Sequence, residues 1–164
     1  MKKILIIRHA EAESPSQITD FDRKLTQNGI EKANEIGQIL HQKGIIPDFV
    51  GASSALRTLE TATIIATKVG FPVNDIHKDK YLYIATTKDL VSYIQNIDNQ
   101  YHTAILVGHN PYISYLAEKL SKVDLGSFSP CSVACVAYEN CEDWQEIGIL
   151  AGKLAWFEDT KEGF

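Results

Sequence analysis

Four side chains stand out because their types and positions would suit the binding and transfer of an anionic group: Arg8, His9, Arg57 and His109. Guanidinium groups bind phosphate-like oxyanions, often through two parallel hydrogen bonds. A neutral imidazole can act as a nucleophile or as a general base near neutral pH. The residue types therefore favour a phosphoryl group as the ligand.

Each of these residues taken alone has an ordinary structural explanation. A histidine after a strand is more often a hydrogen-bonded structural residue than a catalyst, and Arg57 could pair with Glu60. Together, basic side chains gathered at one rim of an acidic protein need a counterion, and no Asp or Glu adjoins His109 to supply it. An oxyanion ligand is the better explanation. A zinc site built on His9 and His109 is disfavoured because Arg8 would repel the metal.

The strands that would position these residues are visible as apolar runs. Residues 4–7 and 103–108 lack polar alternation, which is typical of strands buried on both faces. Residues 47–53 predict a short strand, and residues 71–77 predict an edge strand because Pro72 would weaken a central one. Further strands are expected within residues 132–139 and 144–158.

Two helices follow from apolar spacing and from their end signals. Thr26 is expected to cap a helix over residues 27–43, and Gly44 should end it. Residues 87–97 carry apolar side chains at helical spacing, which predicts a second helix.

Two more helices should begin directly after strands. Ser53 or Ser54 is expected to cap a helix that runs to Gly70. Asn110 is expected to cap another helix, with Pro111 at its first position. Free N–H groups at helix N-termini attract anions, so both helix starts could help to hold a phosphoryl group.

The alternation of strands and helices predicts an α/β fold. We expect a three-layer αβα sandwich with a mostly parallel central sheet and helices on both faces. Ligands of such sheets lie beyond the carboxyl ends of the strands. Arg8, His9, Arg57 and His109 all follow predicted strands, so the topology should bring them to one rim.

Length and charge limit the possible functions. The 164 residues contain no evident linker or repeat, which predicts a single domain over residues 1–164. A formal net charge of −5 gives no global attraction for nucleic acid or an anionic membrane. No stretch approaches the roughly 20 apolar residues of a membrane span, and no signal-peptide pattern is present. We therefore expect a cytoplasmic protein; its oligomeric state is left open.

The three cysteines, Cys131, Cys135 and Cys141, are not spaced like a redox or zinc motif. No arginine closely follows Cys131 or Cys135 to hold a phosphate above the thiolate. A cysteine-based phosphatase loop is thus excluded, and we expect reduced structural thiols.

Several segments resemble the histidine phosphatase superfamily, which has a phosphoglycerate-mutase-like fold. "IIRHAEAE" resembles its Arg-His-Gly opening, with Ala10 in place of the usual glycine, while "SSALRTLETA" and "LVGHNPYISYLA" resemble its second arginine and second histidine motifs. "DFDRKLTQNG", "YLYIATTKDL" and "LVGHNP" are similar, in order, to the SixA-type phosphohistidine phosphatase branch. The resemblance covers residues 3–140.

The resemblance implies a role for each motif residue. His9 would be the nucleophile, Arg8 and Arg57 would clamp the phosphoryl oxygens, and His109 would complete a positive pocket. Arg23 would add a further cation; its alternative is a surface arginine near Asp20 and Asp22. No metal or cofactor is implied. The substrate would be a phosphorylated protein, for example one carrying a histidine phosphotransfer domain.

A missing acid distinguishes this chain from other enzymes of the same fold. Mutases and acid phosphatases carry a carboxylic acid in the segment between the second arginine and second histidine motifs. The corresponding stretch of this chain, "KYLYIATTKDL", offers Tyr81 and Tyr83 but no carboxylate at the expected place. The predicted helices and strands between Arg57 and His109 leave no room for a capping subdomain, so we expect an open site. Two alternatives remain: a small-molecule phosphomonoesterase or mutase that uses the same site, and a non-catalytic phosphate-binding module.

Overall fold

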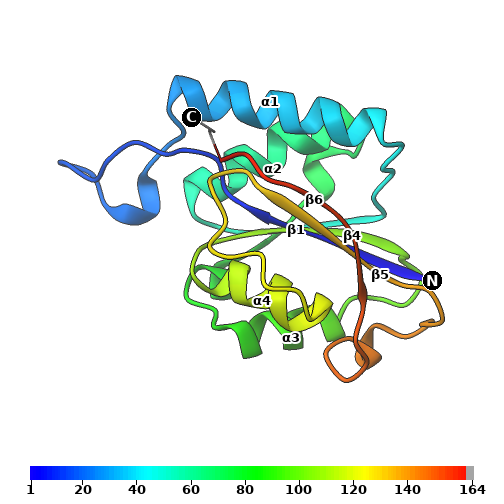
Figure 1. Ribbon diagram of the computed structural model, residues 1–164. Helices are drawn as coiled ribbons and strands as arrows, with labels where there is room; N and C mark the ends of the chain where they lie inside the picture. Colours follow the sequence, from blue (N-terminus) through cyan, green and yellow to red (C-terminus); the bar gives the residue numbers. More distant parts are fainter. Residues whose placement is uncertain (162–164) are drawn as a thin grey trace.

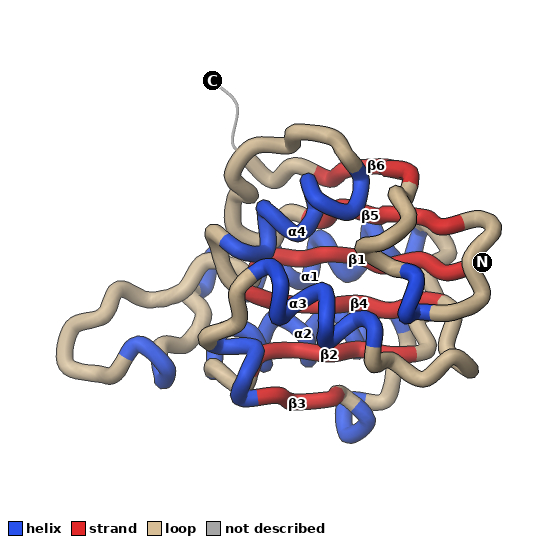
Figure 2. The backbone as a smooth tube through the Cα atoms, turned by 90° about the horizontal axis from the view of Figure 1, so that it is seen from below, coloured by secondary structure: helices blue, strands red, loops and turns tan. Residues whose placement is uncertain are grey.

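The computed structural model describes residues 1–161 and has a six-stranded sheet at its centre (Figure 1). The strands are β1 (Lys2–Arg8), β2 (Phe49–Ser53), β3 (His77–Asp79), β4 (Thr103–Gly108), β5 (Val133–Tyr138) and β6 (Lys153–Glu158). Their spatial order is β3-β2-β4-β1-β5-β6, as Figure 2 shows. The first four in this order pair in parallel, and β5 runs antiparallel to both of its neighbours. The prediction of a mostly parallel sheet is confirmed.

Helices cover both faces of the sheet. The α-helices are α1 (Gln27–Gln42), α2 (Leu56–Val69), α3 (Thr87–Gln95) and α4 (Tyr112–Ser121). Helices α1 and α2 lie on one face, and α3 and α4 lie on the other (Figure 1). Short 3-10 turns connect these elements: η1 (Asp20–Asp22), η2 (Val73–Asp75), η3 (Lys80–Tyr83) and η4 (Trp144–Glu146). The predicted three-layer αβα sandwich is confirmed, and residues 57–109 form only these layers, with no capping subdomain.

The central strand β1 holds the two helical layers together. Ile4 and Ile6 pack toward α3 and α4, whereas Leu5 and Ile7 pack toward α1 and α2. All four side chains are fully buried. Side chains alternate across a strand, so an unbroken apolar run supplies both cores at once.

The first helix begins and ends as predicted. The Thr26 hydroxyl accepts a hydrogen bond from the Gly29 N–H at 3.0 Å. Gly44, with a φ of +74°, follows the end of the helix in the left-handed region that favours glycine. Gly70 ends α2 in the same conformation, as expected.

The predicted caps of α2 and α4 were wrong. Neither Ser53 nor Ser54 caps α2, whose N-cap residue is Ala55, and Asn110 does not cap α4, whose N-cap residue is Pro111. These polar side chains have other partners. The Ser53 hydroxyl lies 2.8 Å from a His109 ring nitrogen, and the Asn110 amide donates to the Phe128 carbonyl at 2.9 Å. Each side chain also bonds near its helix, since the Ser53 hydroxyl accepts from the Ala55 N–H at 3.2 Å and Asn110 Oδ1 accepts from the Ser114 hydroxyl. Neither accepts from an N–H of the first helical turn, which is what a cap requires.

Two predicted strands are shorter than their sequence segments. Within residues 71–77 the chain forms the turn η2, and the edge strand β3 begins only at residue 77. Within residues 144–158 the chain forms η4 first, and β6 starts at residue 153. In the second case Gly148 adopts a φ of +87°, which an extended strand does not allow.

Two further features belong to the described part of the chain. Among residues 1–161, no helix combines the length and apolarity needed to cross a membrane. The three cysteines are buried and free. Burial raises the pKa of Cys131 to about 12 and that of Cys135 to about 11, which fits inert structural thiols.

Gly29 lets α1 approach the segment that follows β1. A Cβ atom added at Gly29 would lie 2.1 Å from the Glu11 carbonyl oxygen, far inside the contact distance. The Thr26 N–H donates to the same oxygen at 3.0 Å. The start of α1 is therefore fixed against the chain two residues after His9.

We expect Gly29→Ala to lower the free energy of unfolding by about 1–3 kcal/mol because of overpacking, although alanine alone would favour a helix by about 1 kcal/mol. Chemical denaturation would measure the change. Asn28→Ala, at an exposed position in the same turn, is the matched control and should be close to wild type. A Gly29→Ala protein as stable as wild type would mean that this close approach does not constrain the fold.

Candidate active site

The carboxyl ends of β1, β2 and β4 meet at one rim of the sheet. Arg8 pairs with Gly108 in the parallel register, and the His9 N–H donates to the Gly108 carbonyl at 3.1 Å. His9 and His109 thus follow neighbouring strands, and their ring centroids are 5.4 Å apart. Arg57, from the first turn of α2, reaches the same place, with its Nη2 atom 3.4 Å from His109 Nδ1. The structure brings these four predicted residues together.

The His9 ring is held in one orientation. Its Nδ1 atom lies 2.7 Å from the Ala10 carbonyl oxygen, which can only accept, so Nδ1 carries the proton and Nε2 has a free lone pair. The Ala10 N–H in turn donates to the Thr61 hydroxyl at 3.0 Å. A fixed tautomer with a free Nε2 atom is what a nucleophilic imidazole requires.

His9 is uncharged at neutral pH. Burial lowers its pKa to about 4, and the positive charges of Arg57, Arg8 and Arg23 act in the same direction. The hydrogen bond to the Ala10 carbonyl opposes this shift but does not cancel it. The ring therefore keeps its nucleophilic lone pair.

His109 is also uncharged. Its Nδ1 atom accepts from Arg57 Nη2, so the proton lies on Nε2, which donates to the Ser53 hydroxyl at 2.8 Å. Burial, followed by the proximity of His9 and Arg57, lowers the pKa of His109 to about 3. In the free protein the positive potential of the site therefore comes from arginines, and His109 adds no charge of its own.

Arg8 and Arg57 each keep a buried N–H donor without a hydrogen-bond partner among the described residues. Arg8 Nη1 donates to the Phe128 carbonyl at 2.8 Å, and both terminal nitrogens of Arg57 donate to Asp20. The Nε atoms of Arg8 and Arg57 are buried and have no hydrogen-bond partner among the described residues. Buried unpaired donors are rare and costly, and an oxyanion ligand in the site could satisfy them.

The sequence did not reveal the counterion of this cluster. Asp20 accepts hydrogen bonds from Arg57 Nη2 at 3.1 Å, from Arg23 Nη1 at 2.8 Å and from the Tyr83 hydroxyl at 2.5 Å. The alternative pairing of Arg57 with Glu60 is wrong, because Glu60 accepts from a backbone N–H on the loop before α1. Asp20 lies within the segment "DFDRKLTQNG", three residues before Arg23, and that spacing was the only signal that could have found it.

Neither Asp20 nor Tyr83 is available as a proton donor. The hydrogen bonds from Tyr83 and Arg23 keep the pKa of Asp20 well below its usual range, so the carboxylate stays ionised. The hydrogen bond to Asp20 raises the pKa of Tyr83. The Tyr83 proton is thus committed to Asp20.

Known proteins resemble this chain in sequence. Residues 4–82 match the profile of the histidine phosphatase superfamily (branch 1). An uncharacterized protein of Mycobacterium tuberculosis is 30% identical over 117 residues, which cover 71% of this chain and 71% of that protein. The chain belongs to the histidine phosphatase superfamily.

Other similarities extend over nearly the whole chain. An uncharacterized chloroplastic protein of Arabidopsis thaliana is 28% identical over 165 residues, which cover 94% of this chain and 74% of that protein. The structure of the protein histidine phosphatase SixA in complex with tungstate superimposes with a TM-score of 0.81 at 20% identity, covering 96% of both chains. At that identity the similarity establishes a common fold.

The positive charges near His9 are the guanidinium groups of arginines. Residues 1–161 contain no group of three or more His, Cys, Asp or Glu side chains arranged to hold a metal ion. The guanidinium groups of Arg8 and Arg57 could neutralise a phosphoryl ligand.

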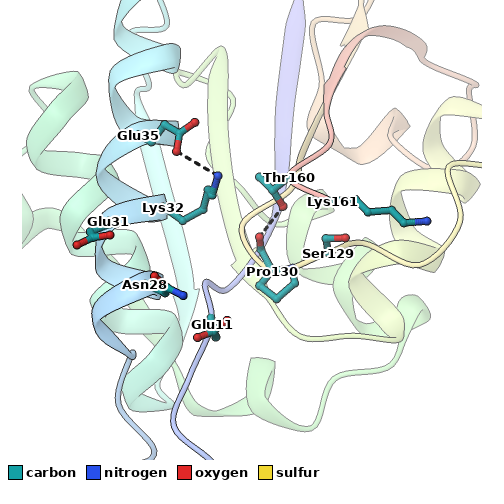
Figure 3. Close-up of a pocket in the computed structure, with 9 residues that line it drawn as sticks. All are labelled: Glu11, Asn28, Glu31, Lys32, Glu35, Ser129, Pro130, Thr160 and Lys161. Carbon is teal, nitrogen blue, oxygen red and sulfur yellow. Dashed lines mark hydrogen bonds and ion pairs between the residues drawn. The ribbon is translucent and has the colours of Figure 1, made fainter. Parts of the chain in front are cut away.

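A hollow lined by residues of α1 and of neighbouring loops has the wrong charge for phosphate (Figure 3). It has a volume of about 460 Å³ and is lined by Glu11, Asn28, Glu31, Lys32, Glu35, Ser129, Pro130, Thr160 and Lys161. Three carboxylates face two lysines there, and Lys32 is paired with Glu35 at 3.1 Å. The hollow contains none of the site residues and does not suit an anion.

We expect the His9 ring of the folded protein to titrate near pH 4 rather than near its ordinary value of about 6.5. NMR titration of the ring resonances would measure this, with His9→Gln used to assign them. Between these two pH values the unfolded chain binds more protons, so the free energy of unfolding should fall as the pH is lowered. A His9 midpoint near 6.5 would contradict the proposed neutral, buried ring.

Proposed function

We propose that the protein removes the phosphoryl group from phosphohistidine on a protein substrate, with His9 as the nucleophile and without a metal. One observation carries this proposal. A neutral His9 with a free Nε2 atom lies among guanidinium groups, while the nearby carboxylate of Asp20 is ionised and the proton of Tyr83 is already engaged. Such a site can accept a phosphoryl group but offers no evident acid to a basic leaving group.

In the first step, His9 Nε2 would attack phosphorus while the N–P bond of the substrate phosphohistidine breaks. The electron pair of that bond returns to the substrate imidazole, which takes a proton from solvent. Arg8 and Arg57 would stabilise the charge on the phosphoryl oxygens. The product of this step is a phosphohistidine at His9.

In the second step, water would attack the phosphorus of this intermediate. The N–P bond to His9 breaks, its electron pair returns to Nε2, and the proton lost by water passes to solvent. The Ala10 carbonyl holds the Nδ1 proton in place through both steps, so the ring returns to its starting tautomer. Inorganic phosphate leaves and the cycle can repeat.

The leaving group favours phosphohistidine over alkyl phosphates. Imidazole has a conjugate-acid pKa of about 6.5, so solvent can protonate it near neutrality. An alkoxide is about as basic as hydroxide, whose parent water has a pKa of about 15.7. Without a placed acid, alkyl phosphate cleavage should lose roughly 100- to 10,000-fold, which is the usual contribution of general acid catalysis.

The fold alone does not choose the substrate, since one fold can host many reactions. The similarity to SixA supports the proposal, because SixA is a protein histidine phosphatase. We further propose a phosphorylated protein as partner, for example a histidine phosphotransfer domain, and a cytoplasmic location. A small-molecule phosphomonoesterase is the competing alternative, and the two differ in their dependence on the leaving group.

His9→Ala should abolish turnover, because the covalent intermediate cannot form without the imidazole. Wild-type protein mixed with a ³²P-labelled phosphodonor and quenched in alkali should carry acid-labile, alkali-stable label on His9. The His9→Ala protein should carry none, while still binding orthovanadate through its arginines. Retention of much of the wild-type rate by this variant would remove His9 as the nucleophile, and a labelled His9 would exclude a non-catalytic binding module.

The ratio kcat/KM should fall in the order phosphohistidine protein, aryl phosphate, alkyl phosphate. Aryl phosphates should be intermediate because phenoxide leaves more easily than alkoxide. All three would be measured at one pH, together with Tyr83→Phe, which removes only the hydroxyl.

Two outcomes of this experiment would count against the proposal. Comparable values for the alkyl and phosphohistidine substrates would indicate a hidden acid and favour the phosphomonoesterase. A selective loss of alkyl phosphate cleavage in Tyr83→Phe would identify Tyr83 as that acid.

A further inference from the structure

We infer that Asp20 is a positioning residue of this site, whose carboxylate joins Arg23 to Arg57 and so presents both guanidinium groups to the phosphoryl ligand. The inference rests on the proposed function, since it assigns a role within that phosphoryl site. It also favours Arg23 as a further cation of the site over the alternative of a surface arginine.

Asp20 binds side chains from three separate parts of the chain. Its carboxylate accepts one hydrogen bond each from Arg23, from Arg57 on α2 and from Tyr83 at the end of η3. Its backbone carbonyl accepts a further bond from Arg57 Nη1 at 2.7 Å. One residue therefore ties the segment before α1 to two elements of the main body.

The Asp20 carboxylate offsets the repulsion between two like charges. Arg23 and Arg57 carry like charges that would repel each other if both approached the same ligand. A carboxylate that accepts from both guanidinium groups offsets this repulsion, and hydrogen bonds between ionised groups are the stronger kind. The Arg57 side chain is only 7% exposed, whereas that of Asp20 is 46% exposed, so the link lies at the boundary with solvent.

The link lies one contact away from the catalytic rings. Arg57 Nη2 lies near both the Asp20 carboxylate and His109 Nδ1, at 3.1 and 3.4 Å. The Tyr83 ring, whose hydroxyl bonds to Asp20, packs against His109 in a T-shaped arrangement with centroids 5.5 Å apart. A displacement of Asp20 would reach His109 by two routes.

Asp20 leaves part of Arg57 available for a ligand. It uses the two terminal nitrogens of the guanidinium group, while the Nε atom remains buried and unpaired among the described residues. If the Asp20 carboxylate competed with the substrate, we would expect it to bond to all the N–H donors of Arg57. The observed pattern instead suits a second layer of contacts that holds the guanidinium plane in place.

The fold itself does not depend on this link. Residues 14–19 are exposed, and the loop before η1 extends away from the main body, as Figures 1 and 2 show. Besides Asp20, the contact of Phe21 with Tyr83, at a centroid distance of 5.0 Å, holds the turn η1 in place. Loss of the Asp20 carboxylate should therefore disturb the site without unfolding the sheet.

The test compares Asp20→Asn with Asp22→Asn. Asp22 lies in the same turn, is exposed, and accepts a side-chain hydrogen bond only from Thr19 among the described residues. Orthovanadate affinity, measured by calorimetry, should weaken by about 10-fold in Asp20→Asn, the size of one hydrogen bond to a charged group. The kcat for an aryl phosphate should fall by at least as much, and Asp22→Asn should stay within about twofold of wild type on both measures.

A double-mutant cycle with Arg23→Ala tests the route of the effect. If Asp20 acts through Arg23, the effect of Asp20→Asn on vanadate affinity should shrink in the Arg23→Ala background, because interacting residues are not additive. Asp20→Glu should recover part of the loss, since it keeps the charge. The thermal midpoints of all variants should remain close to wild type.

Three results would overturn the inference. The first is tighter vanadate binding by Asp20→Asn, which would make Asp20 an internal anion that competes with the ligand. The others are vanadate affinity and kcat that do not change in Asp20→Asn, and effects of Asp20→Asn and Arg23→Ala on vanadate affinity that are fully additive. The vanadate titration needs no turnover. If the wild-type protein hydrolysed no phosphate at all, the proposed function would fail while the role of Asp20 would still be decided.

Discussion

The parallel pairing of β1 with β4 is the constraint on which the site depends. The two strands end in register, so the backbone of His9 bonds to Gly108 and the two histidine rings meet. Both strands are buried on both faces, and each is held by two helical layers. A shift by one residue would exchange the two cores and move both rings off the rim. The packing of the apolar runs therefore fixes the geometry of the chemistry.

Burial then sets the charge state of the two histidine rings that the sheet has positioned. A buried imidazole surrounded by guanidinium groups cannot easily take up a proton, and both His9 and His109 are neutral as a result. Their hydrogen bonds fix the tautomers, through the Ala10 carbonyl for one ring and the Ser53 hydroxyl for the other. In the proposed mechanism, His9 can therefore act as a nucleophile at neutral pH without a base to remove a proton from it.

The sequence predicts those parts of the structure that depend on local patterns. The runs at residues 4–7 and 103–108 reveal buried strands, and hence the fold in outline, because their composition leaves no polar face. Ser53 and Asn110 were assigned to the wrong partners, since a short polar side chain near a helix start can bond to the helix or to a neighbouring loop, and only the tertiary arrangement decides. The bonds of Asp20 were missed for a related reason. Its partners on α2 and η3 lie 37 and 63 residues further along the chain, so no periodicity joins them.

The charges gathered at the rim match those of one particular kind of ligand. Arg8, Arg23 and Arg57 contribute three positive charges, Asp20 contributes one negative charge, and the two neutral rings contribute none, which leaves a balance of +2. A phosphoryl group in its doubly ionised form carries the opposite amount. The complex would then be electrically neutral, whereas a singly charged anion of the same size would leave one buried positive charge uncompensated. The net charge of the site therefore matches the valence of the ligand proposed for it.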